Sequence, residues 1–412
     1  MAPSKQITPK PKTPKKQQQL APAKKVRAPR KQPPAPAKKV RAPRKQPPAM
    51  KANQQQLSPG PDIISDLSDC ILIHILSFMD AQEAVQTCIL SKRWINVWKK
   101  LHTLTLLDYS ELSGKLFEHF VFKFLSLRDD QTDIHSILLH PPFLRKECNK
   151  LVYHILKYAF SHHVQHLLIN FICFKPNCFS FSSSTLKSLE LTSDHLISGV
   201  ISIFPNSLNF PALTTLSLSY FTFFSNEDGC AEPFSTFNML NTLIIHHCQV
   251  LHKRHLCISN AKLENLSITM CYYMISRTYF EIELYAPSLR TFCFKGNHIS
   301  KLFGSKSFSS SIKQLKINIR CFENIGKNYC ILLNWLEQFV NIESLMVDTY
   351  TLEVLSRDLL KVNPPSLINL KSLKIETSDV SYVCRYDEEI NFLLQNSHSA
   401  NVENIIVDAF DY

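Results

Sequence analysis

The stretch "LKSLEL", Leu186–Leu191, places leucine at its first, fourth and sixth positions. The same six-residue frame, with aliphatic or aromatic residues at those positions, recurs through the second part of the chain. It starts at Val164, Leu186, Leu213, Leu240, Leu263, Leu289, Ile312, Ile342, Leu370 and Val402. Because alternate residues of a strand face opposite ways, the fourth and sixth positions should point into a core. The frame therefore predicts a series of short strands that share one core.

The spacing of these frames is typical of a known repeat. Successive frames begin about 20–30 residues apart, and leucine-rich repeats have periods of about 20–29 residues. Such repeats often continue with Asn or Cys three positions after the last apolar residue. The frame at Leu240 continues to Cys248, and the frame at Leu289 continues to Asn297. We therefore predict an α/β fold in which residues 164–412 form a leucine-rich-repeat solenoid.

The outward-facing residues of the frames would lie on the concave face of such a solenoid. Small hydroxyl residues dominate the early frames, and charges of both signs dominate the later ones. Such a mixed surface suits a protein or peptide better than a uniform polyanion. The predicted target-binding residues are Glu190, Thr192, Ser217, Ile244, His246, Ser267, Lys295, Lys316, Asp348 and Lys374.

Residues 62–107 have a different pattern, which predicts three short helices. Ser68 is placed to cap the first helix, and Asp80–Glu83 has the spacing of a capping box at the start of the second. Ser91 is placed to cap a third helix, which carries two tryptophans. Because a unit of about 45 residues buries little surface, we expect part of its apolar surface to contact a partner.

Three strings in this segment resemble a plant-type F-box: "ISDL" at Ile64–Leu67, "HILSF" at His74–Phe78 and "LSKRW" at Leu90–Trp94. The resemblance implies binding to the Skp-type adaptor, and through it to a cullin, in an SCF-type cullin-RING ubiquitin ligase. The sequence departs from the family motif at one position, where the Leu-Pro of the family is replaced by Leu67-Ser68. This proline helps the family to bind the adaptor, so the replacement bears on the affinity. The adaptor-binding residues that the resemblance implies are Leu67, Ile71, Leu72, Ile75, Leu76, Val85, Leu90, Lys92, Arg93 and Trp94.

The C-terminal part also resembles plant F-box/leucine-rich-repeat proteins, including those with an FBD-like end, over Ser344–Glu376 and Leu393–Val407. Between the F-box and the frames, residues 108–163 are interpreted as a linker and a first irregular repeat.

Residues 1–61 have the composition of a disordered basic tail. They contain 16 Lys and Arg, no acidic residue and 14 of the 23 prolines, and the sequence of 21–34 recurs unchanged at 35–48. Proline at this density and repulsion between like charges prevent a packed core. Two interpretations stay open: a segment that binds a nuclear-import receptor or a polyanion, and a solvated tail without a specific partner.

Catalytic chemistry has little support in the sequence. With seven glycines widely spaced, the phosphate-binding and dinucleotide-binding glycine motifs are excluded. The stretch "HHCQVLHKRHLC", His246–Cys257, is rich in His and Cys but lacks the paired spacing of zinc ligands, so we predict no metal, no cofactor and no catalytic residue. No apolar run is long enough to span a membrane, so we expect no membrane partner. The 13 scattered cysteines predict reduced thiols, as in a protein of the nucleus or cytoplasm.

These observations favour one function and leave two alternatives. The favoured function is the substrate-recognition subunit of an SCF-type ubiquitin ligase, in which the F-box binds the adaptor and the repeats bind a target protein. The first alternative is an interaction scaffold that is not coupled to ubiquitination. The second is a receptor for a small ligand.

Overall fold

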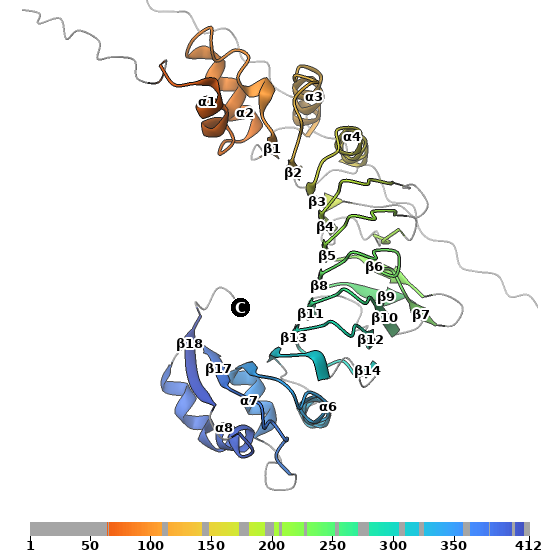
Figure 1. Cartoon of the computed structure of the whole chain (residues 1–412), viewed down its shortest axis with the longest axis vertical. Helices are drawn as coiled ribbons and strands as arrows, with labels where there is room; N and C mark the ends of the chain where they lie inside the picture. The colour runs from red at the N-terminus through yellow and green to blue at the C-terminus, as the bar shows by residue number, and fades with distance from the viewer. Residues whose placement is uncertain are drawn as a thin grey trace, which may run out of the picture. The chain divides into compact units, whose positions relative to one another are not determined.

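The computed structural model of the chain is shown in Figure 1. It describes residues 64, 66–108, 114–141, 148–172, 181–193, 202–205, 208–225, 229–251, 255–270, 280–304, 310–320, 325–356, 363–378, 380–397 and 400–407. The chain divides into two units, Met1–Asp62 and Ile63–Tyr412. The basic tail predicted at residues 1–61 lies outside the described residues.

A twelve-stranded sheet forms the centre of the second unit. Its strands follow one another in chain order, and every neighbouring pair is parallel. The strands are β1 Thr103–Leu107, β2 Ser136–His140, β3 His166–Ile172, β4 Ser188–Ser193, β5 Thr215–Ser219, β8 Thr242–His246, β11 Asn265–Met270, β13 Thr291–Gly296, β15 Gln314–Ile319, β16 Ser344–Asp348, β17 Ser372–Thr377 and β18 Asn401–Ile406. Each repeat frame therefore contributes one strand.

From β1 to β17 the fourth and sixth positions of the frame lie in the core, as the alternation predicts. The frame predicted at Val402 is wrong: Val402 pairs with Leu373, which is a fourth position, and it is 44% exposed. Leu243 in β8 pairs with Leu266 in β11, which pairs in turn with Phe292 in β13. All three are at most 1% exposed. The residue between the two buried positions is partly exposed in most strands, as the alternating burial of β8 and β11 shows.

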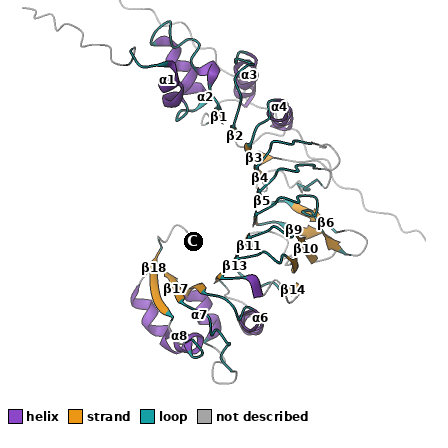
Figure 2. Cartoon of the chain, viewed as in Figure 1, coloured by secondary structure: helices purple, strands orange, loops and turns teal. Residues whose placement is uncertain are grey.

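The layer that covers the core changes along the chain (Figure 2). After the first two strands come helices α3 Gly114–Ser126 and α4 Cys148–Ser161, and near the C-terminal end come α6 Ile325–Gln338, α7 Thr349–Leu355, the 3₁₀ helix η4 Val380–Tyr386 and α8 Asp387–Leu394. The middle repeats carry short strands instead. These are β7 Cys230–Ala231, β10 His255–Ser259, β12 Glu281–Tyr285 and β14 Leu302–Gly304 in a four-stranded sheet, and β6 Thr222–Phe224 and β9 Gln249–Leu251 in a pair.

The large sheet begins earlier than the sequence analysis placed it. Strands β1 and β2 lie at the end of the predicted F-box and within the predicted linker 108–163, and both pair in register with the strands that follow. Leu101–Leu106 and Ile134–Leu139 also fit the frame, with all three key positions of each buried. These two frames could be recognised in the sequence, but they are followed by helices, so they were not assigned to the repeats.

The second unit begins with the region predicted to be an F-box, which we call the N-terminal segment. Its described residues contain two α-helices, α1 Asp69–Leu76 and α2 Ala81–Gln86. The capping box of α2 is confirmed: Asp80 Oδ1 accepts hydrogen bonds from the Gln82 and Glu83 amides at 2.7 and 2.9 Å, and Glu83 Oε2 accepts one from the Asp80 amide at 3.2 Å. None of the described helices combines the length and apolar character needed to cross a membrane.

The prediction of a third α-helix was wrong. The chain forms the 3₁₀ helix η1 Thr87–Ile89, then turns, then the 3₁₀ helix η2 Trp98–Lys100. The Trp94 amide bonds the Ser91 carbonyl at 3.1 Å, which is an i→i+3 turn. The four residues of 94–97, Trp-Ile-Asn-Val, all have modest helix propensity, so no extended α-helix is favoured here.

The burial pattern predicts opposite effects for two neighbouring residues in β11. Replacing Leu266 by Ala should lower the free energy of unfolding by about 2–5 kcal/mol, because the residue is 1% exposed and fills the core between two strands. Replacing Ser267 by Ala should change it by less than about 0.5 kcal/mol. Chemical denaturation of both variants measures the difference, and equal losses would mean that the register is wrong by one residue.

Candidate functional site

Three of the predicted adaptor-binding residues lie in the core of the N-terminal segment. Leu72 and Leu76 of α1 are fully buried, and Trp94 is 5% exposed. They belong to the same cluster as Trp98, which stacks on Phe124 of α3 at 5.1 Å between ring centroids. These three side chains hold the segment together and attach it to the first repeats, so their assignment to a binding surface was wrong.

A second set of apolar side chains in this segment is exposed. Of the predicted residues, Ile71 and Leu90 are 44% and 62% exposed, while Leu67, Ile75 and Val85 are partly buried. Sequence reasoning missed four more. These are Ile64, Phe78, Ile89 and Ile95, with exposed fractions of 55%, 78%, 88% and 45%. We call Ile64, Ile71, Phe78, Ile89, Leu90 and Ile95 the exposed apolar set.

Exposure of this size is unusual for so short a segment. Large apolar side chains scattered singly over a surface are ordinary, whereas a contiguous exposed apolar patch marks an interaction site. Lys92 is exposed beside Leu90 and adds a positive charge at this surface. Phe78 and Ile89 were predicted to lie within the first two helices, whereas α1 ends at Leu76 and α2 at Gln86.

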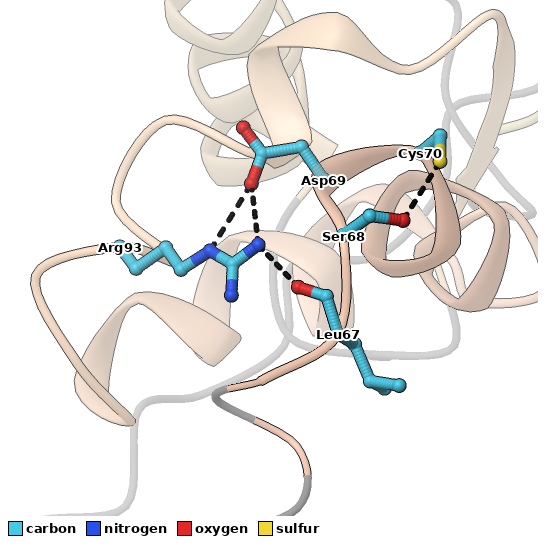
Figure 3. A network of polar contacts seen from close by, with 5 residues as sticks. All are labelled: Leu67, Ser68, Asp69, Cys70 and Arg93. Carbon is cyan, nitrogen blue, oxygen red and sulfur yellow. Dashed lines mark hydrogen bonds and ion pairs between the residues drawn. The ribbon is translucent and has the colours of Figure 1, made fainter.

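Arg93, whose predicted role in adaptor binding stays a prediction, also makes contacts within the segment. Its guanidinium spans back to the start of α1, where Nε and Nη2 donate to Asp69 Oδ1 at 3.1 and 2.8 Å. Nη2 also donates to the Leu67 carbonyl oxygen. Figure 3 shows both contacts converging on the first turn of the helix. Arg93 therefore fixes the position of α1 relative to the turns before η2, and it is not a free cation on the binding surface.

Ser68 stands at the start of α1 without capping it. Its side chain makes no cap hydrogen bond, and its Oγ lies 2.8 Å from Cys70 Sγ instead (Figure 3). The predicted capping role was therefore wrong. The backbone of Ser68 has φ −66° and ψ 154°. This φ falls at the value that a proline ring imposes.

The large sheet has a second candidate surface on the side opposite the core, which we call the open face. Glu190 is exposed there, and Thr192, Ile244, His246, Ser267, Lys295 and Lys374 are partly exposed. Burial lowers the pKa of His246, and the charge of Lys295 lowers it further. Lys374 lies 3.5 Å from Glu403 on the neighbouring strand, so charges of both signs meet at the C-terminal end of this face.

Two of the predicted target-binding residues are not accessible. Asp348 is 1% exposed, and its Oδ1 accepts a 2.8 Å hydrogen bond from the Thr351 amide as the N-cap of α7. Burial raises the pKa of this carboxyl group. Ser217 is 7% exposed because its small side chain stands in register between the larger Glu190 and Ile244. Both assignments were wrong for these reasons.

Lys316 is partly exposed and is paired with a carboxylate of the same sheet. Its Nζ lies 2.5 Å from Glu376 Oε1, and Asn318 Nδ2 donates to Glu376 Oε2 at 2.6 Å. Glu376 and Asn318 are 8% and 4% exposed. This buried cluster joins β15 to β17 across β16, so it stabilises the open face more than it offers a charge to a partner.

A row of uncharged polar residues on the open face was missed. From β1 to β17 its members occupy the third frame position, and Asn401 of β18 continues the row because it pairs in register with Ser372. They are Thr103, Ser136, His166, Ser188, Thr215, Thr242, Asn265, Thr291, Gln314, Ser344, Ser372 and Asn401. Hydroxyl and amide groups in such a row can donate and accept hydrogen bonds along a bound chain.

The Arg93 contacts give a direct prediction. Arg93→Ala should lower the free energy of unfolding of the N-terminal segment by about 1 kcal/mol, because the ion pair is partly exposed while the carbonyl contact adds a charge-assisted hydrogen bond. Arg93→Lys should recover less than half, since an ammonium cannot bridge both acceptors as the planar guanidinium does. Hydrogen exchange at α1 measures the loss. Lys92→Ala is the control, and an equal loss in it would contradict this role.

Comparison with known proteins agrees with this geometry. The F-box domain model matches residues 64–105, the segment that carries the exposed apolar set. F-box/LRR-repeat protein 25 of Arabidopsis thaliana is 31% identical over 196 residues, which cover 46% of this chain and 69% of the relative. Another F-box/LRR-repeat protein of that plant is 28% identical over 357 residues, covering 84% of this chain and 72% of the relative. The chain belongs to the F-box/leucine-rich-repeat family of plant proteins.

Proposed function

We propose that this protein is the substrate-recognition subunit of an SCF-type cullin-RING ubiquitin ligase. The exposed apolar set carries the proposal. Six large apolar side chains between residues 64 and 95, each at least 44% exposed, provide the surface that the Skp-type adaptor would cover. The adaptor in turn links the chain to a cullin. Full burial of a side chain of this kind contributes about 1.5–3 kcal/mol, from which the entropy cost of association is subtracted.

In this proposal the repeats form a leucine-rich-repeat solenoid whose open face holds a target protein. Three properties of this face support a protein or peptide target. The row from Thr103 to Asn401 offers hydrogen-bonding groups without charge, Glu190 and Lys374 offer charges of opposite sign, and Ile244 offers apolar contact. The protein itself transfers no group. It holds the target near the ubiquitin-carrying subunit, which raises the effective concentration of the reacting lysine.

Adaptor binding is tested with purified proteins and matched variants. Phe78→Ser combined with Ile89→Ser should weaken binding of the Skp-type adaptor by at least about tenfold, because each removes contact area of the kind that dominates interfaces. These side chains are 78% and 88% exposed, so the fold should be unaffected. Ser68→Pro should tighten binding, since φ at this position already suits proline and the substitution restores the Leu-Pro of the family. Calorimetry or surface plasmon resonance gives the affinities.

The control removes exposed apolar residues elsewhere. Leu116→Ser combined with Ile368→Ser alters side chains that are 69% and 60% exposed, outside the F-box match, and should leave adaptor binding unchanged. Wild type that fails to bind at micromolar concentration, with Ser68→Pro no better, would contradict the ligase proposal. It would favour instead a scaffold that is not coupled to ubiquitination.

The basic tail adds a proposal about location. We propose that residues 1–61, with 16 basic and no acidic residues, direct the protein to the nucleus by binding an import receptor. A fluorescent fusion that lacks residues 1–61 should lose nuclear accumulation and keep its affinity for the adaptor. Replacing the basic residues of 21–48 by Gln in the full chain should have the same effect. Unchanged nuclear accumulation in both would contradict the proposal.

A further inference from the structure

Two cysteines and a glutamate meet on one face of the four-stranded sheet. Cys230 lies in β7, Cys257 in β10 and Glu283 in β12, which are three adjacent parallel strands. Cys257 stands directly opposite Glu283 in register. The two sulfur atoms and a carboxylate oxygen all lie within 4.8 Å of one another, and Cys230 Sγ is 3.8 Å from Glu283 Oε2.

These separations are close to those of a formed metal site. Zinc binds thiolate sulfur at about 2.3 Å and carboxylate oxygen at about 2.0–2.2 Å, so tetrahedral ligands are roughly 3.5–3.8 Å apart. The 3.8 Å between Cys230 Sγ and Glu283 Oε2 meets this requirement. Small rotations of the side chains would bring the remaining separations within the same range, without movement of the strands.

The carboxylate of Glu283 is held in an orientation that suits such a site. Its Oε1 accepts a 2.6 Å hydrogen bond from the Tyr285 hydroxyl, and its Oε2 faces Cys230. Hydrogen bonds from neighbouring groups commonly fix metal-binding carboxylates in this way. Tyr285 lies two residues beyond Glu283 in β12, so it shares the same face of the sheet.

The electrostatic setting favours a cation. The pKa of Cys257 is raised to about 12, mainly by burial and in addition by the neighbouring Cys230, Glu232 and Glu283. The pKa of Cys230 is raised chiefly by burial as well. A thiolate at either position would therefore be unfavourable in the absence of a cation, because the site is buried and carboxylates lie nearby. A divalent ion would compensate this charge and would release the thiol protons on binding.

We propose that Cys230, Cys257 and Glu283 bind a thiophilic divalent cation of the zinc class. Two sulfur ligands favour zinc over magnesium and calcium, which prefer oxygen. Cys230 and Glu283 are partly exposed, so a water can take the fourth position. The bound ion would join three strands, including β7, which has only two residues and pairs with β10.

The repeat spacing explains how distant residues reach one site. Cys230, Cys257 and Glu283 follow one another in the sequence at nearly the same interval as successive frames. Cys257 and Glu283 both lie six positions before the start of a frame, at Leu263 and Leu289. The stretch His246–Cys257, which is rich in His and Cys, contributes one ligand, and the other two come from neighbouring repeats.

The test is a titration of the reduced, chelator-treated full chain with Zn²⁺ and with Co²⁺. At the same zinc concentration, wild type should bind one more zinc ion per chain than Cys257→Ser. The affinity for this additional ion should fall at least about 100-fold in Cys257→Ser and at least about tenfold in Glu283→Gln. Cobalt should give sulfur-to-metal charge-transfer absorption in wild type that is absent in Cys257→Ser. Circular dichroism checks that the variants fold, and Glu283→Gln tests the site without altering a sulfur.

Two matched variants serve as controls. Cys293→Ser removes another half-buried thiol, and Glu281→Gln neutralises a carboxylate on the same face of β12 as Glu283. Both should bind zinc and cobalt like wild type. Unchanged stoichiometry and cobalt spectrum in Cys257→Ser, or an equal loss in Cys293→Ser, would overturn the proposal. So would reduced wild type that binds no zinc while Cys230 and Cys257 form a disulfide on oxidation.

Discussion

The constant register of the parallel strands is the constraint on which the rest of this structure depends. From β4 to β17, each strand aligns the same frame positions with its neighbour, as in Leu243, Leu266, Phe292 and Leu315. A shift of one residue would move the whole apolar set of a strand to the open face. Because the register holds, one core runs through the repeats while the covering layer changes from helix to strand and back.

The same register determines which features were predictable. The frame identified the inward residues of the later strands, because a period of two shows directly in the sequence. The covering layer was not predictable to the same degree. Helix α3 does show the helical spacing, with Phe117, Val121 and Phe124 buried. Strands of two or three residues such as β7 and β14 are too short to show any pattern, and only their neighbours define them.

The F-box shows where sequence periodicity stops being informative. Helical spacing groups Ile71, Leu72, Ile75 and Leu76 on one side of α1, but it does not say which of them face the core. The structure buries Leu72 and Leu76 and leaves Ile71 exposed. The contacts of Arg93 within the segment could not be predicted for a related reason, since its partners Asp69 and Leu67 lie 24 and 26 residues earlier in the chain. Contacts at that separation depend on the folded arrangement of helices, which local patterns do not contain.

The two proposed binding surfaces lie on different elements: the exposed apolar set in the F-box and the polar row on the open face of the sheet. Hydrogen–deuterium exchange with and without a purified Skp-type adaptor tests this division most directly. With the adaptor bound, we expect slower exchange within residues 69–100 and unchanged exchange in strands β5 to β17. Slower exchange in those strands, with none in the F-box, would contradict this division.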